Sequence, residues 1–334
     1  MSENINDIPV EVVEELSDNI QFIPVEDLKV TPVPFSALSQ TQNWGMGLAA
    51  IQDVWQIAKG EGVTVAVLDT GIAEHVDLSE CWTKDNVFNC SDNESWEDKA
   101  SGHGTHVAGI IAGSDNDFGV VGVAPKCKIV PIKVLNDDGS GSFETIAAGL
   151  RKAIELNVDI INMSLGASSE PPKFIHDLIL EAVSKGIVVV AAAGNDSNSV
   201  NYPARYDEVI AVAALDAGGR LATFTSKDET VDIVAPGVDI YSTFLRNEYC
   251  KMSGTSQASP FVAGICALII SALKNLNLMQ EFGNQFCQAD MMVALQNVCS
   301  MQSAVVEPGE EKNWGPGVPK LANIDWSTIT VKKS

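Results

Sequence analysis

The sequence predicts an α/β fold in which a doubly wound, mainly parallel β-sheet is flanked by helices on both faces. Short apolar runs rich in β-branched residues alternate with segments of helical spacing, which is the pattern of a parallel sheet covered by helices. The runs are apolar along their whole length, as expected of central strands that are buried on both faces. Such strands are predicted at residues 63–68, 128–134, 158–162 and 187–192.

Helices are predicted between and after these strands. Residues 143–156 and 174–185 have apolar side chains at helical spacing, so each is expected to cover one face of the sheet. Residues 259–273 form a longer and more apolar segment, which predicts a buried helix, and residues 290–298 predict a shorter one.

Composition and charge predict one acidic domain with a short extension. The chain has 334 residues, 46% of them hydrophobic, which is enough to bury a full core. We expect a single domain over residues 39–334, preceded by an acidic, Pro-containing extension over residues 1–38. The formal net charge of −23 argues against nucleic acid as a partner, because phosphate binding needs a basic surface. Calcium binding, high salt or solubility accounts for the charge better.

The beginning of the sequence bears on location. Residues 1–19 are acidic and lack the basic start and apolar run of a signal peptide. No later segment has 18 uninterrupted apolar residues, so no membrane span is predicted. We therefore expect a cytoplasmic protein without membrane contact. A leader removed before this numbering begins would leave no trace, so a secreted protein is the alternative.

The seven cysteines favour a reducing compartment. An odd number leaves at least one thiol unpaired within the chain, and the spacings match neither CxxC nor a zinc-ligand pattern. The alternative is a secreted enzyme with two local disulfides, Cys81–Cys90 and Cys287–Cys299.

Three short Gly-rich segments supply an acid, a base and a nucleophile. Asp69 closes an apolar strand in Asp-Thr-Gly, so its carboxylate emerges where parallel sheets place their sites. His103 begins a helix in His-Gly-Thr-His-Val-Ala-Gly and can take a proton from a hydroxyl while donating to Asp69. Ser256 lies in Gly-Thr-Ser-Gln-Ala-Ser-Pro at a helix start, which favours negative charge. Taken singly, Asp69 could cap a turn or a helix and Ser256 could be a helix N-cap. The three segments taken together indicate a serine hydrolase.

The order acid, base, nucleophile is that of the subtilisins. Over roughly residues 39–326 the chain resembles the subtilase family of serine endopeptidases, and a fourth segment, Ala-Gly-Asn ending at Asn195, is similar to the oxyanion-hole motif of that family. The resemblance implies that Asn195 and the backbone N–H of Ser256 stabilise the tetrahedral intermediate.

The resemblance also separates the two neighbouring histidines. It implies that His103 is the general base and that His106 is structural. A metal site on this pair is disfavoured, because the two lie at i and i+3 without the acid of the HExxH pattern. Gln257 stands where the commonest subtilisin pattern has Met, which removes an oxidisable thioether beside the nucleophile.

Further positions are implied to line a substrate cleft. A polypeptide would bind extended, as an added strand. Phe143 is implied to wall the fourth subsite, with a core residue as the alternative. Asp196 and Asn201 match the rim and base of the first subsite, and would accept polar or basic side chains beside apolar ones. The full implied set is Ser164, Leu165, Gly166, Phe143, Ala193, Gly194, Asp196 and Asn201.

The resemblance further implies structural calcium. The loop over residues 114–120 is similar to the high-affinity calcium loop of the family, an oxygen cage of the kind that suits calcium. A solvated turn is the alternative. A second, weaker cation site on backbone carbonyls is implied near residues 202–206. The implied ligands are Gln40, Asp77, Ser114, Asn116, Phe118 and Val120 for the first site, and Ala204, Tyr206 and Val209 for the second.

The extension carries its own hypothesis. It is shorter than the folded prodomain of secreted subtilisins, and Gln21-Phe-Ile-Pro-Val25 resembles the Leu-Ile-Pro-Tyr element of intracellular subtilisins, which implies a cleft-blocking segment acting in cis or in trans. We expect residues 1–38 to cover the site until they are cut near Leu38, a disordered tail being the alternative.

Two other functions stay open: an inactive subtilisin-like binding module, and a dedicated processing protease for phage or peptide maturation. The sequence leaves the oligomeric state open.

Overall fold

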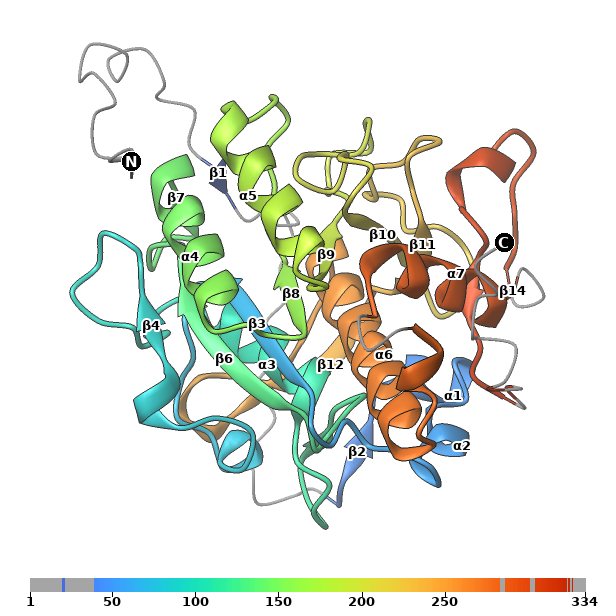
Figure 1. Cartoon of the computed structure of the whole chain (residues 1–334), viewed down its shortest axis with the longest axis horizontal. Helices are drawn as coiled ribbons and strands as arrows, with labels where there is room; N and C mark the ends of the chain where they lie inside the picture. The colour runs from blue at the N-terminus through green and yellow to red at the C-terminus, as the bar shows by residue number, and fades with distance from the viewer. Residues whose placement is uncertain are drawn as a thin grey trace.

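A seven-stranded parallel sheet forms the centre of the molecule. The computed structural model describes residues 20–21, 39–282, 286–300, 304–322, 324 and 326. The strand order is β11-β10-β9-β8-β3-β6-β4, and every neighbouring pair is parallel (Figure 1). The predicted fold class is therefore confirmed. The strands are β3 (Thr64–Asp69), β4 (Phe88–Asn89), β6 (Lys128–Lys133), β8 (Ile160–Met163), β9 (Val188–Ala192), β10 (Ile210–Leu215) and β11 (Ile233–Pro236).

Helices cover both faces of this sheet. The helices are α1 (Trp44–Leu48), α2 (Ile51–Trp55), α3 (His103–Ala112), α4 (Phe143–Glu155), α5 (Lys173–Ser184), α6 (Thr255–Asn275) and α7 (Gln288–Val298). Along β3, Val65 and Val67 pack into one hydrophobic cluster with α3 and α6, whereas Ala66 and Leu68 pack into a second cluster with α4 and α5. Alternate side chains thus face opposite layers, which explains why the strand is apolar throughout.

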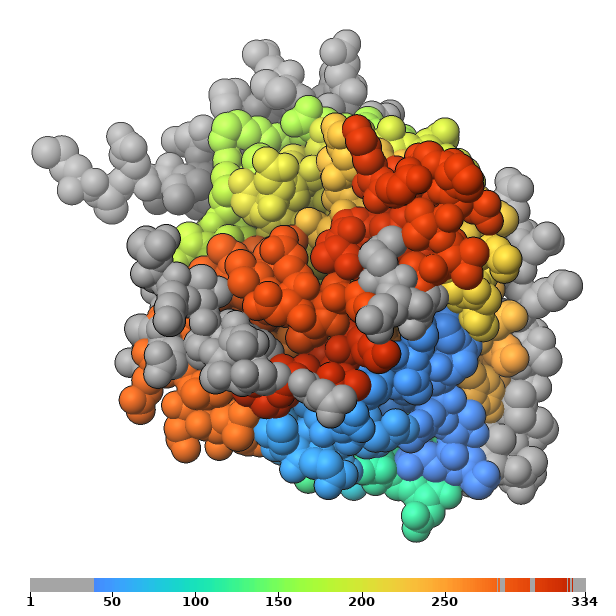
Figure 2. Space-filling view, turned by 90° about the vertical axis from the view of Figure 1, so that its right-hand side faces the viewer, coloured from blue at the N-terminus to red at the C-terminus, as the bar shows by residue number. Residues whose placement is uncertain are grey.

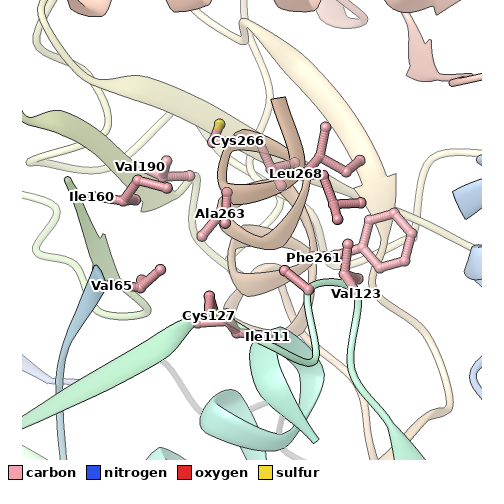
Figure 3. Close-up of a cluster of buried hydrophobic side chains, with 14 of the residues drawn as sticks. Val65, Ile111, Val123, Cys127, Ile160, Val190, Phe261, Ala263, Cys266 and Leu268 are labelled. Carbon is pink, nitrogen blue, oxygen red and sulfur yellow. The ribbon is translucent and has the colours of Figure 1, made fainter. Parts of the chain in front are cut away.

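The helix α6 runs through the middle of the core. Its apolar side chains, among them Phe261, Ala263 and Cys266, lie in one cluster with Ile160 of β8 and Val190 of β9 (Figure 3). Of the helices in the described residues, α6 alone is long and apolar enough to cross a membrane, but its whole apolar stretch is buried inside the fold. Its composition is accounted for by its place in the core.

The order of connections creates one reversal point. From β3 the chain crosses by α3 to β6 on one side, then returns by α4 to β8 on the other side of β3. Ligand sites in open α/β sheets lie at such a point, beyond the carboxyl ends of the strands. The sites of interest should therefore follow Asp69 at the end of β3, Met163 at the end of β8 and Ala192 at the end of β9.

Small two-stranded pairings complete the molecule. Four pairs are seen: β1 (Ile20–Gln21) with β7 (Ser140–Gly141), β2 (Thr41–Gln42) with β5 (Val120–Val121), β12 (Ile240–Thr243) with β13 (Tyr249–Met252), and β14 (Cys299–Ser300) with β15 (Val318–Pro319).

The two ends of the described domain lie side by side. The backbone N–H of Leu321 donates to the carbonyl of Ala49 at 2.8 Å. In Figure 2 the red C-terminal segment accordingly borders the blue segment that carries α1 and α2.

All seven cysteines fall in the described residues, and all are free thiols. The alternative with Cys81–Cys90 and Cys287–Cys299 disulfides is therefore not what the fold contains. Cys81 is buried in the core, and burial raises the pKa of its thiol to about 12. Cys287 instead directs its sulfur to Asp290 Oδ2 at 2.9 Å, at the start of α7.

Candidate active site

An aspartate and a histidine meet at the end of β3. Asp69 is fully buried, and its Oδ1 accepts hydrogen bonds from the backbone N–H of Thr70 and from Nδ1 of His103, each at 2.7 Å. Because the carboxylate can only accept, Nδ1 carries the proton, and a neutral His103 has its lone pair on Nε2. The imidazole is thereby held in the tautomer that a general base needs.

The start of α3 is built for close approach to this pair. Thr70 Oγ1 accepts from the N–H of Gly104 at 2.9 Å. A Cβ at Gly104 would lie 2.2 Å from the carbonyl oxygen of Gly71, so only glycine fits. The helix can therefore bring His103 onto Asp69 only because the residue after the histidine has no side chain.

Asp98 is a residue of this site that sequence reasoning missed. It is buried, and its carboxylate accepts from the N–H of Gly102 at 2.9 Å and from Thr105 Oγ1 at 2.9 Å, which caps the start of α3. Burial raises the pKa of Asp98 above its usual value, against the lowering effect of these hydrogen bonds. The N-cap position of α3 is occupied by Gly102, so Asp98 lies outside the spacing of a helix cap and gave no local signal.

Charges around His103 favour its protonated form. Burial on its own lowers the pKa of the imidazole, but the charge of Asp69, the hydrogen bond to Asp69 and the charge of Asp98 outweigh burial. The net pKa of His103 is therefore raised above its ordinary value. A proton taken from a substrate or nucleophile is stabilised on this ring.

The second histidine of α3 has a different environment. His106 is fully buried, and its Nε2 faces the carbonyl oxygens of Ile240 at 3.1 Å and Cys250 at 3.3 Å. Burial, then repulsion from His103, lowers the pKa of His106 to about 3, so it stays neutral. Its contacts tie α3 to the β12–β13 hairpin.

Ser256 stands in the first turn of α6. Its hydroxyl donates to the carbonyl oxygen of Ser164 at 3.1 Å, and Ser164 directly follows β8. Because β8 pairs with β3, with Met163 beside Leu68, Ser164 and Asp69 lie at the ends of neighbouring strands. The structure thus places Ser256 beside the end of β8, and the Asp69–His103 pair at the end of the neighbouring strand β3.

Asn195 is oriented by the residue before the serine. Its Oδ1 accepts from both the N–H and the Oγ1 of Thr255, each at 2.9 Å. Because a backbone N–H can only donate, the oxygen must face Thr255, and the amide nitrogen faces the other way. A Cβ built on Gly254 would lie 3.3 Å from this nitrogen, which places the amide donor beside the start of α6.

The residues predicted to line the first subsite lie around Gly194. A Cβ at Gly194 would approach the amide nitrogen of Asn201 and Oγ of Ser226, each to 2.7 Å. Asn201 is buried, and the N–H of Asn201 donates to the carbonyl of Ala193 at 2.8 Å. The carboxylate of Asp196 accepts from the hydroxyl of Ser226. The residues predicted for the base and the rim of this subsite therefore lie close together.

The residues predicted for the extended substrate and the fourth subsite are mostly buried. Ser164, Leu165 and Gly166 continue from β8, and all three are buried. Phe143 is 3% exposed and packs in the cluster on the α4 side of the sheet, which agrees with its alternative role as a core residue. It directly follows the loop that contains β7.

The predicted calcium ligands converge on Asp77. Its Oδ1 accepts from Asn116 Nδ2 at 2.9 Å and its Oδ2 accepts from the N–H of Val120 at 2.8 Å. Gln40 Nε2 donates to the carbonyl of Ser114 at 2.9 Å, and the hydroxyl of Ser114 donates to the carbonyl of Asp77. One carboxylate, two amides and two backbone carbonyls are therefore joined in one hydrogen-bond network.

Two further contacts complete this loop. Phe118 donates its N–H to the carbonyl of Asn116 at 2.6 Å, which closes a tight turn. Sequence reasoning missed Tyr249, whose hydroxyl donates to Asp77 Oδ2 at 2.9 Å. Burial, and then this hydrogen bond, raise the pKa of the Tyr249 hydroxyl. In the described residues, no group of three or more His, Cys, Asp or Glu side chains lies close enough together to hold a metal ion.

The residues predicted for the weaker cation site are also close together. Ala204, Tyr206 and Val209 are buried in one short segment, where the N–H of Val209 donates to the carbonyl of Tyr206 at 2.9 Å. The Tyr206 ring stacks on His176 with centroids 4.1 Å apart.

Comparison with known proteins identifies the family. Residues 60–303 match the model of the subtilase family (peptidase S8). The chain is 43% identical to subtilisin DY of Bacillus licheniformis over 72% of this chain and 89% of that protein. It is 42% identical to an intracellular serine protease of Paenibacillus polymyxa, over 72% of this chain and 78% of the relative. It is 37% identical to the major intracellular serine protease of Bacillus subtilis, over 77% and 82%. With the geometry at the ends of β3, β8 and β9, these matches establish that the chain belongs to the subtilase family and is a subtilisin-like serine peptidase.

Proposed function

We propose that the protein is an endopeptidase that cleaves polypeptides through an acyl-enzyme on Ser256. The observation that carries the proposal is the buried 2.7 Å bond between Asp69 Oδ1 and His103 Nδ1, because it fixes the tautomer of a base at the reversal point that also holds Ser256. In the reaction, the Ser256 hydroxyl leaves the Ser164 carbonyl and gives its proton to Nε2 of His103 as its oxygen attacks the substrate carbonyl.

The remaining steps use the same groups. The oxyanion is held by the amide nitrogen of Asn195 and the backbone N–H of Ser256, which lies in the first turn of α6. His103 then passes its proton to the leaving amine, and a water molecule releases the acyl group by the reverse sequence. Asp69 stays ionised throughout and stabilises the imidazolium.

The experiment that tests this role is intact-mass analysis after treatment with a fluorophosphonate, which labels activated serines. We expect one adduct on the wild-type chain, located on Ser256 by peptide mapping, and none on Ser256→Ala. Peptidase activity that survives in Ser256→Ala would refute the mechanism. A wild-type chain that is never labelled would favour the inactive binding module.

The first cation site fits calcium by its donor chemistry. Hard oxygen donors from carboxylate, amide and carbonyl groups are the ligands that calcium prefers. The amides of Gln40 and Asn116 can present oxygen or nitrogen to the same position after a 180° turn, with little movement of the loop. Bound calcium would be held by Gln40, Asp77, Asn116 and neighbouring carbonyls, and would stabilise the loop without entering the reaction. A weaker cation at Ala204, Tyr206 and Val209 belongs to the same proposal.

The extension is proposed to keep the precursor latent. In support, the backbone of β1 pairs antiparallel with β7, Ile20 opposite Gly141 and Gln21 opposite Ser140, directly before Phe143 (Figure 1). The rest of the extension, including most of Gln21–Val25 and the expected cut near Leu38, lies outside the described residues. A strand on β7 would lie close to Phe143, the residue implied to wall the fourth subsite, and would obstruct an extended substrate there.

Latency is tested by following the full-length chain over time by mass and by peptide hydrolysis. We expect activity to rise in step with loss of the first 38 residues or so, and full-length Ser256→Ala to be cut near Leu38 by added active enzyme. Full activity before any cleavage would contradict latency.

We further propose a cytoplasmic location, supported by the seven free thiols and by the two relatives described as intracellular.

A further inference from the structure

A proline deprives the nucleophile residue of its helical hydrogen bond. In an α-helix the carbonyl of residue i accepts from the N–H of residue i+4. For Ser256 that residue is Pro260, which lies inside α6 and has no N–H. The proline ring also crowds the carbonyl four residues before it. The carbonyl of Ser256 is therefore turned out of the helix ladder, and Ser256 itself is buried.

A side chain just beyond the end of β8 takes the place of the missing donor. Ser164 Oγ donates to the Ser256 carbonyl at 2.9 Å, and Asn162 Nδ2 donates to Ser164 Oγ at 3.0 Å. Ser259 Oγ in turn donates to Asn162 Oδ1 at 2.8 Å. The three side chains are fully buried, so no solvent competes for these bonds. We call Ser259, Asn162 and Ser164 the serine brace.

The direction of every proton in the serine brace is fixed from one end. A carbonyl oxygen can only accept, so the hydroxyl of Ser164 must donate its one proton to the carbonyl oxygen of Ser256. Ser164 then has to accept from the amide nitrogen of Asn162, which turns the amide oxygen toward Ser259. All the donors therefore point the same way along the chain, an arrangement in which each bond strengthens the next.

The brace joins the nucleophile to the proposed substrate segment. Ser164 contacts Ser256 twice: its hydroxyl donates to the Ser256 carbonyl, and its own carbonyl accepts from the Ser256 hydroxyl at 3.1 Å. Ser164 is also the first residue of the segment expected to pair with substrate. Two bonds between the same two residues fix both the distance and the orientation of the serine relative to a bound peptide.

We infer that Ser259, Asn162 and Ser164 are positioning residues for the peptidase reaction, which replace the hydrogen bond lost at Pro260 and set the place of the Ser256 hydroxyl against the scissile bond. This inference rests on the proposed role of Ser256 as nucleophile. Reactive groups displaced by about 1 Å can lose about 10²-fold in rate. The brace therefore acts on the rate of acylation rather than on substrate affinity.

The test compares three full-length variants, each treated with the same trace of wild-type enzyme so that any processing of the extension is equal. Ser164→Ala removes the donor to the Ser256 carbonyl, and Ser259→Ala removes the far end of the brace without touching Ser256. Ser271→Ala is the matched control, because Ser271 is a fully buried serine of α6 whose hydroxyl donates to a backbone carbonyl, that of Glu61, at 2.9 Å.

The readouts are kcat and KM for a peptide, the rate of labelling by the fluorophosphonate, and Tm. We expect kcat and the labelling rate to fall about 10- to 100-fold in Ser164→Ala and about 3- to 10-fold in Ser259→Ala, with KM within about twofold. Ser271→Ala should lose a comparable amount of Tm and keep the wild-type kcat, as a purely structural bond would.

Three results would overturn the inference. Equal kcat in Ser164→Ala and Ser271→Ala would reduce the brace to ordinary core bonding. A change in KM alone would make it part of substrate binding. If the wild-type chain is labelled at a residue other than Ser256, the proposed function itself fails and the inference with it, and this result is distinct from the first two.

Discussion

Replacing Asp69 with asparagine separates two contributions of the carboxylate. Its Oδ1 accepts from both Thr70 N–H and His103 Nδ1. In Asp69→Asn, we expect the amide oxygen to take the position of Oδ1. An amide nitrogen at that position would face the N–H of Thr70, and two donors cannot bond to each other. His103 therefore keeps its Nδ1–H tautomer and loses only the negative charge beside it.

The expected loss follows from that charge. Two unit charges about 4 Å apart at an effective dielectric constant of about 20 interact by about 4 kcal/mol, which corresponds to about 10³-fold in rate. A triad in which the aspartate-to-asparagine change also imposes the wrong tautomer loses about 10⁴-fold. We expect kcat/KM of Asp69→Asn to fall by about 10³-fold, the smaller of these two losses, because only the charge is removed.

The pH dependence gives a second readout. The reaction needs neutral His103, whose pKa is raised by Asp69, so the acid limb of the wild-type profile should lie above the ordinary histidine value of about 6.5. In Asp69→Asn, burial is left as the main influence on the ring and lowers its pKa, so the limb should move to lower pH. The assay is kcat/KM for one peptide between about pH 5 and 10.

The control is Asp98→Asn. This change removes a second charge that raises the pKa of His103. Because Asp98 hydrogen-bonds to Gly102 and Thr105, the change leaves the bond between Asp69 and His103 in place. We expect a smaller downward shift of the acid limb and a rate at high pH within about tenfold of wild type. If the limb stays in place in Asp69→Asn, the account of His103 is wrong.

Three further predictions concern other parts of the site. Asn195→Ala should lower kcat about 10²–10³-fold at little change in KM, a value taken over from subtilisin, and unchanged kcat would exclude the amide from the oxyanion hole. Calcium should raise Tm in the wild type, measured by thermal unfolding with and without chelator, and Asp77→Asn should abolish most of that rise. Lys133→Met should destabilise the fold by about 1–3 kcal/mol in urea unfolding, because the fully buried Lys133 donates to the Thr70 carbonyl at 2.6 Å.

Burial on both faces leaves a local mark, an unbroken apolar run, from which four of the central strands were predicted; β10 carries the same mark. The runs at 63–68, 128–134, 158–162 and 187–192 correspond to β3, β6, β8 and β9 within one or two residues. β10 and β11 were not predicted, nor was the β12–β13 hairpin, whose strands alternate polar and apolar residues weakly. The predicted helices at 143–156, 174–185 and 290–298 correspond to α4, α5 and α7.

The start of α6 shows where local reasoning fails. The sequence predicted an apolar helix over residues 259–273, with Ser256 at its start. The helix begins at Thr255 instead, and the bond that Pro260 cannot make is supplied by Ser164, far away in the sequence. No local pattern reports such a partner. For the same reason Asp98, Lys133 and Tyr249 were missed: their importance comes from what the fold places beside them.

The site residues follow separate strands of one sheet, so the spacing of the sheet sets the geometry of the site. A molecule whose sheet opens therefore loses activity and at the same moment becomes an unfolded chain, which is what a peptidase with an extended cleft cleaves best. Under the proposed endopeptidase function, each folded copy would cleave the unfolded ones, and their loss would be irreversible. For this protein, the lifetime of the preparation should shorten as its concentration rises, and the unfolding rate of the sheet sets the lower limit of that lifetime.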